Sequence, residues 1–232
     1  MNKLTPVQSE LLKILESFMH DKAYELPADF HDMAKLEQLF KFAQVHKLAS
    51  VVFEQIRTDA VWQKEEFQGL FAFSKRSAVR EVMMQMQRTD GFLNIYEKLG
   101  AEGVKPLIIK GLICRNLYTK SDYRTSGDED ILLPRAYFEK CDAIMLENGF
   151  SREELEGELP YEIPYINKQN GTYIELHFSL FPEESGAYGH LKNRSTGQPS
   201  GADRTSGSAG AANSVQIGMG RVELLKKYDI IE

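Results

Sequence analysis

The chain has 232 residues, of which 42% are hydrophobic, and a formal net charge of −6 at pH 7. That length is enough for one sizeable core with a helical subdomain, and the acidic balance argues against a general nucleic-acid-binding surface. Cys114 and Cys141 lie in apolar segments, which is typical of buried free thiols in a reducing compartment. The N-terminus lacks a signal-peptide pattern, and no apolar run approaches the length of a membrane span. We therefore expect a cytoplasmic protein.

Residues 1–100 are expected to form a helical N-terminal region. Thr5, Pro6 and Gln8 have the spacing of a capping box with proline at the first helical position. Apolar residues then recur at helical intervals. Further helices are predicted over 33–46, 48–57 and 63–99, the last with a break near Gly69 or Gly91.

The apolar period changes at Val104, and residues 101–182 are expected to form a β-sheet core. The predicted elements are strands at 107–109 and 130–133, helices at 112–118 and 134–148, and a hairpin of strands 162–167 and 172–178. Asn170-Gly171 between the last two strands is a strong hairpin signal. The order β-α-β-α-β-β behind a helical region predicts an α+β protein.

Residues 183–232 differ in composition from the rest of the chain. Small and polar residues dominate from Ser185 to Ser214, which is typical of a disordered linker. We therefore expect a low-complexity tail that is disordered or aberrant. One hypothesis is a frameshifted or truncated C-terminus.

Three acidic residues are the strongest candidates for chemistry. Asp128 and Asp130 lie two residues apart at the start of an apolar run, so in a strand both carboxylates face the same way. Glu175 is flanked by apolar residues in a later predicted strand, where an unpaired acid is costly. We expect the three carboxylates to converge at one sheet edge around a hard cation such as Mg²⁺. His177 lies on the face of Glu175, and a structural histidine is favoured there over a ligand or a base.

Three segments carry a resemblance to a known family: Leu107-Ile108-Ile109-Lys110-Gly111, the run from Arg124 to Leu133, and Ile174-Glu175-Leu176-His177. Together they resemble the uncharacterised bacterial nucleotidyltransferase family of the polymerase-beta-like superfamily. The resemblance covers roughly residues 30 to 181 and leaves the tail unmatched. It implies a helical N-terminal region packed on a nucleotidyltransferase-like mixed β-sheet domain.

The resemblance also implies a site. Asp128, Asp130 and Glu175 would hold one or two Mg²⁺ ions that bridge the phosphates of a nucleoside triphosphate (NTP), with Glu175 alternatively acting as the base. The residues implied around the nucleotide are Lys110, Gly111, Arg124, Ser126 and Gly127. Two positions depart from the family pattern, since Leu112 replaces a small residue and Glu129 separates the two aspartates. We expect Glu129 to face away from the metal, near solvent or paired, with the strand starting only at Asp130, and Arg115 to lie on a solvated helix face.

The implied activity is transfer of a nucleoside monophosphate from an NTP to an acceptor hydroxyl, with release of pyrophosphate. The acceptor is a small molecule, a protein or an RNA end, and the acidic chain makes a long nucleic acid the least favoured. Two alternatives stay open. In the first, the chain is a non-catalytic nucleotide- or metal-binding module, inactive through loss of its C-terminal part. In the second, it is a helical interaction protein with a surface acidic cluster.

Overall fold

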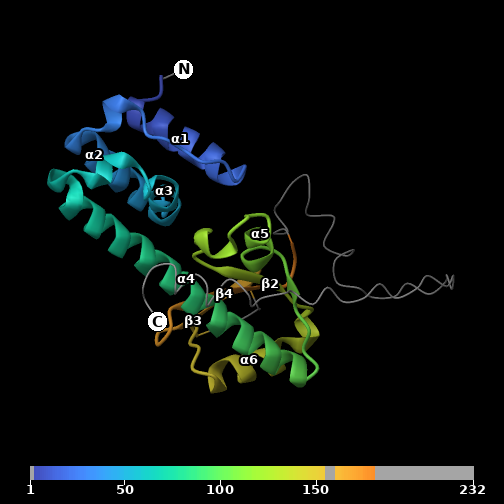
Figure 1. Cartoon of the computed structure of the whole chain (residues 1–232). Coiled ribbons are helices and arrows are strands. Elements are labelled where there is room, and N and C mark those ends of the chain that lie inside the picture. Colours follow the sequence, from blue (N-terminus) through green and yellow to red (C-terminus); the bar gives the residue numbers. More distant parts are fainter. Residues whose placement is uncertain (1–2, 155–159, 181–232) are drawn as a thin grey trace. The chain divides into compact units, whose positions relative to one another are not determined.

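A computed structural model describes residues 3–154 and 160–180 of the chain (Figure 1). The predicted tail, residues 183–232, lies outside the described residues. In the described part of the chain, no helix combines the length and the apolar character needed to cross a membrane.

The helical N-terminal region begins with α1, Pro6–Met19. The predicted capping box is confirmed, because the Thr5 hydroxyl accepts from the Gln8 N–H at 3.3 Å and the Gln8 side chain accepts from the Thr5 N–H at 2.9 Å. The helices that follow are α2 (Met33–Val45), α3 (Ala49–Ile56) and α4 (Gln68–Ala101), with one-turn 3-10 helices at Ala28–Phe30, Ala60–Gln63 and Glu65–Phe67.

The second half of the described chain alternates strands and helices in the predicted order. Its elements are β1 (Leu107–Ile108), α5 (Leu112–Arg115), β2 (Glu129–Leu132), α6 (Phe138–Glu147), β3 (Glu162–Asn167) and β4 (Thr172–His177), with one-turn 3-10 helices at Ser121–Tyr123 and Arg135–Tyr137. Strand β2 begins at Glu129, one residue earlier than predicted, because Glu129 pairs with Ile174 of β4.

The four strands form one mixed sheet in the order β1-β2-β4-β3. Strands β2 and β4 are the inner pair and run parallel, while β1 and β3 pair antiparallel on the outside. A helical N-terminal region and a mixed sheet confirm the predicted α+β class.

One face of the sheet is covered by helices. Side chains from β2, β3 and β4 that point to this face pack with residues of α4 and α6 in a single apolar core. Its members include Phe92, Leu99, Ile131, Cys141, Met145, Ile163, Tyr165, Ile174 and Leu176. Because strand side chains alternate, the neighbours of these residues point to the opposite face, where the polar side chains described below gather.

Helix α4 begins at Gln68 after two 3-10 helices, so the break predicted near Gly69 or Gly91 lies next to Gly69, and the helix runs unbroken through Gly91. Gly91 lies against the β3–β4 hairpin. A Cβ atom built on Gly91 would lie 2.1 Å from the Thr172 hydroxyl oxygen and 2.6 Å from the Asn170 amide nitrogen. The glycine therefore lets the helix lie directly against the hairpin turn.

Gly91→Ala is expected to destabilise the protein by about 1–3 kcal/mol, because an added methyl group would force the buried Thr172 side chain aside. At Gly100 of the same helix, a built Cβ has no neighbour within 4 Å in residues 3–154 and 160–180. There alanine is expected to stabilise by up to about 1 kcal/mol through helix propensity. Urea denaturation of both variants measures the difference, and equal effects would contradict the described packing of α4 on the hairpin.

Candidate active site

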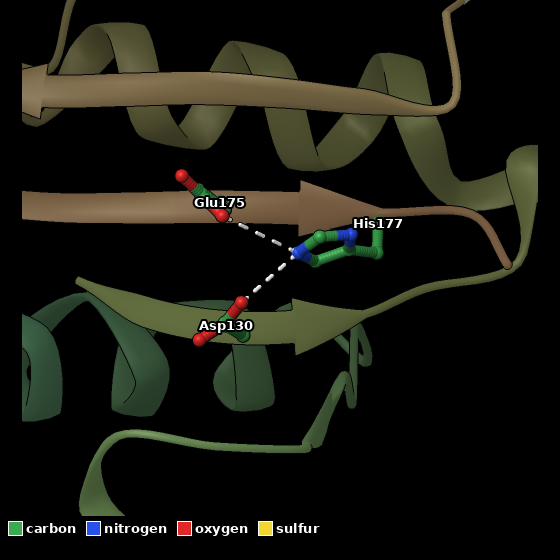
Figure 2. A group of neighbouring side chains, drawn as sticks. All are labelled: Asp130, Glu175 and His177. Atoms are coloured by element: carbon green, nitrogen blue, oxygen red, sulfur yellow. Dashed lines mark hydrogen bonds and ion pairs between the residues drawn. The ribbon is translucent and has the colours of Figure 1, made fainter. Parts of the chain in front are cut away.

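The parallel register of the inner strands places two of the predicted acids side by side. Asp130 of β2 is the Cα partner of Glu175 of β4, and Leu132 is the partner of His177. Glu175 and His177 lie two residues apart on one strand, so both side chains point to the face opposite the apolar core. Figure 2 shows Asp130 and Glu175 directing carboxylate oxygens from neighbouring strands toward the His177 ring.

Three ligand-type atoms meet at this place. His177 Nε2 lies 3.1 Å from Asp130 Oδ1 and 3.7 Å from Glu175 Oε2. The three residues can offer atoms that all lie within 4.8 Å of one another. Asp130 is 1% exposed and His177 4%, whereas Glu175 is only partly buried. The cluster lies over the two inner strands, which differs from the sheet edge expected from the sequence.

Asp128 lies just before β2 and is outside this close group of three. Its backbone is held by a chain of hydrogen bonds that begins on α4. The Ser126 N–H donates to Gln85 Oε1 at 2.7 Å, Arg88 donates to the Ser126 carbonyl at 3.2 Å, and the Ser126 hydroxyl donates to the Asp128 carbonyl at 2.7 Å. Helix α4 therefore fixes the segment that carries Asp128.

Negative charges repel one another on this face of the sheet. The pKa of the Glu175 carboxyl is raised, first by burial and then by the charges of Asp128, Asp130 and Glu162, while His177 opposes the shift. An added cation would relieve this repulsion.

Lys110 already supplies one positive charge. Its Nζ lies 2.8 Å from Asp130 Oδ1, and this hydrogen bond is the main cause of its raised pKa. The Lys110 side chain is 63% exposed, so it can leave Asp130 without disturbing the core.

The other predicted nucleotide-binding residues lie in the segments next to β2. Arg124 is partly buried and donates to the Gly111 carbonyl at 3.4 Å. The Ser126 hydroxyl and N–H are both used within the chain. Gly127 is exposed, and no atom of the described part of the chain lies within 4 Å of a Cβ built on it.

Glu129 points to the opposite face of the sheet from Asp130 and is buried at 3% exposure. Its carboxylate accepts from the Leu112 N–H at 2.6 Å and pairs with the guanidinium of Arg115, which also donates to Thr89 of α4. Arg115 is 1% exposed, so the predicted solvated helix face is wrong for it. Burial raises the pKa of Glu129, while Arg115 and the Leu112 N–H oppose this.

This buried pair explains the glycine before α5. Gly111 has φ +58°, and a Cβ there would lie 2.0 Å from Glu129 Oε2. Only glycine adopts this conformation without strain and leaves room for the carboxylate. The Leu112 N–H, at the start of α5, therefore donates to the Glu129 carboxylate. Two sequence signals for this buried pair were available. One is an acid within an apolar strand, and the other is an arginine four residues after a glycine turn.

A family model described as "Uncharacterised nucleotidyltransferase" matches residues 32–198, well over half of the chain. The chain belongs to this nucleotidyltransferase family. The match extends beyond residue 181, so it includes part of the segment that the sequence resemblance left unmatched. Comparisons with curated proteins and with solved structures found no match. Membership in the family supports nucleotidyl transfer in general.

Proposed function

We propose that the protein is a divalent-metal-dependent nucleotidyltransferase that moves a nucleoside monophosphate from an NTP to an acceptor hydroxyl and releases pyrophosphate. The observation that carries this proposal is the pairing of Asp130 with Glu175 across the inner strands of a family member. Asp128 completes the acidic face from the segment before β2.

The donor set fits a divalent cation. Asp130 and Glu175 offer carboxylate oxygens, which hard cations such as Mg²⁺ prefer. The positively charged Lys110 Nζ already forms an ion pair with Asp130. A bound metal ion neutralises phosphate charge and stabilises the entering and leaving oxygens. We assign Asp130 and Glu175 as metal-holding residues, with Asp128 contributing from the adjoining segment.

The positive side chains beside the acids are assigned to the triphosphate. Lys110 is exposed enough to turn from Asp130 to a phosphate oxygen once a metal ion takes its place. Arg124 lies near Gly111, on the loop before β2. In this arrangement catalysis comes mainly from positioning and charge neutralisation.

The acceptor is assigned as a hydroxyl on a small molecule, a protein or an RNA end. The net charge of −6 makes extended nucleic acid the least favoured acceptor, because a general binding surface for it would need clustered positive charge.

A second candidate function is nucleotide or metal binding without turnover. One observation favours it, since the Leu112 N–H at the start of α5 donates to the chain's own Glu129 carboxylate and is not free for a phosphate.

An assay with each of the four NTPs labelled at the α-phosphate separates the two functions. The enzyme is expected to transfer the label to an acceptor or to itself and to release pyrophosphate, with full dependence on a divalent cation. Saturable metal-dependent NTP binding without labelled product or pyrophosphate, across small-molecule, protein and RNA acceptors, would favour the binding module. Absence of both NTP binding and divalent-metal binding would contradict both.

A further inference from the structure

We propose that His177 binds the metal ion directly through Nε2, and that the site therefore prefers a first-row transition-metal dication such as Mn²⁺ to Mg²⁺. The inference rests on the proposed function, because the same two carboxylates hold the ion. It specifies the kind of cation and adds a nitrogen ligand to a site expected to be made of oxygen alone.

The spacing of the atoms fits shared coordination. Two adjacent ligands of an octahedral ion at about 2.1–2.2 Å from the metal lie about 3.0–3.1 Å apart. His177 Nε2 and Asp130 Oδ1 are 3.1 Å apart, and His177 Nε2 and Glu175 Oε2 are 3.7 Å apart. The Glu175 side chain is 24% exposed and has room for the small movement that brings Oε2 closer to His177 Nε2. In Figure 2 both carboxylates face the same ring nitrogen.

The second ring nitrogen of His177 supports the same assignment. Nδ1 is buried and has no hydrogen-bond partner among the described residues, although buried polar groups nearly always have one. Nδ1 lies 3.5 Å from Oε2 of Glu162, which is the Cα partner of His177 on β3. A histidine that binds a metal almost always donates its other N–H to a carboxylate or carbonyl. Glu162 is positioned for that role, and its side chain is 48% exposed and free to approach.

The ring is held in place before any ion arrives. His177 is 4% exposed, and its ring packs edge-on against Tyr161 with centroids 5.4 Å apart. A purely structural histidine would need only the bond to Asp130. Metal binding also accounts for the approach of Glu175 to Nε2 and for the Glu162 carboxylate beside Nδ1.

A nitrogen ligand changes which ion the site favours. Mg²⁺ is bound through oxygen ligands and retained water, whereas imidazole suits first-row transition metals. Replacing one oxygen ligand by His177 Nε2 therefore strengthens transition-metal binding more than Mg²⁺ binding.

The test is Mn²⁺ binding to the metal-free full chain without nucleotide, followed by electron paramagnetic resonance. The wild type is expected to show spin-echo modulation from a directly bound nitrogen. His177→Asn should lose this modulation and bind Mn²⁺ about tenfold or more weakly, while Mg²⁺ affinity, measured by competition, changes less than about threefold. His20→Asn, at an exposed histidine, should match the wild type.

Glu162→Gln keeps the ring and serves as a second variant in case His177→Asn misfolds. It is expected to weaken Mn²⁺ binding about tenfold. Bound Mn²⁺ without nitrogen modulation in the wild type, or an unchanged preference for Mn²⁺ over Mg²⁺ in both variants, would overturn the assignment. Label transfer with Mg²⁺ is measured separately, so the proposed function can stand when this inference fails.

Discussion

Asp130→Asn is expected to lower kcat/KM for nucleotidyl transfer by about a thousandfold or more. A carboxylate that holds the catalytic metal contributes several kcal/mol of charge stabilisation in the transition state, and each 1.4 kcal/mol is about tenfold in rate. Asp130 is 1% exposed and meets Lys110, His177 and Glu175, so an amide there removes the charge at the centre of the site. Steady-state kinetics with the preferred NTP measures the loss.

The same substitution is expected to leave the free energy of unfolding within about 1 kcal/mol of the wild type. It weakens the pairing with the exposed Lys110, which is worth little, and it removes repulsion toward Glu175. The amide oxygen of asparagine can still accept a hydrogen bond from the His177 ring, which lies 3.1 Å from Asp130 Oδ1. Glu147→Gln, which removes an exposed charge from α6, is the matched control and should keep full activity. Near-wild-type transfer by Asp130→Asn would end the assignment of this residue to metal binding.

Glu129→Gln is expected to destabilise the protein by about 3–5 kcal/mol, because it leaves the buried Arg115 charge without a counter-charge. At about 2–4 °C per kcal/mol for a chain of this size, the Tm should fall by about 6–20 °C. Thermal unfolding of the full chain measures this. Glu102→Gln breaks an ion pair with Lys140 whose side chains are 60% and 50% exposed, and it should cost less than about 1 kcal/mol.

Removing both charges should cost less than removing one. The double variant Glu129→Leu with Arg115→Met replaces the pair with apolar side chains of similar size, which is often nearly neutral in a protein interior. It is expected to unfold at a higher temperature than Glu129→Gln. A loss equal to or greater than that of the single variant would show that the pair does more than compensate buried charge.

The order of elements could be predicted from the sequence because it depends on local signals. The capping box at Thr5 and the Asn170-Gly171 turn act within a few residues, and both mark the ends of regular elements. The apolar period then assigns each segment to helix or strand. The same period puts Leu12 and Met19 on the apolar face of α1, but both are exposed, because periodicity alone does not locate the partner that a helix packs against.

The grouping of the predicted acids depends on how segments distant in the sequence pair with one another. Alternation along β4 places Glu175 and His177 on one face, but only the parallel register brings Asp130 beside them. The sequence does not encode that register in any short segment. The sequence therefore predicted three acids at an edge, whereas the described residues bring together two acids and a histidine over the inner strands.

The buried contacts behind the site could not be predicted because they join distant segments. Glu129 meets Arg115 through the packing of α5, and Gln85 of α4 holds the Ser126 N–H across 41 positions of the chain. Alternation indicates that Glu129 points away from the metal face. It does not identify the arginine that pairs with it.

A crystal structure of the full chain with Mn²⁺ and a non-hydrolysable NTP analogue tests the central claim most directly. We expect anomalous density for the ion between the carboxylates of Asp130 and Glu175, with the triphosphate bridged to it and Lys110 turned from Asp130 toward a phosphate. Density for the ion and the nucleotide elsewhere on the protein, with Lys110 still paired to Asp130, would contradict the account.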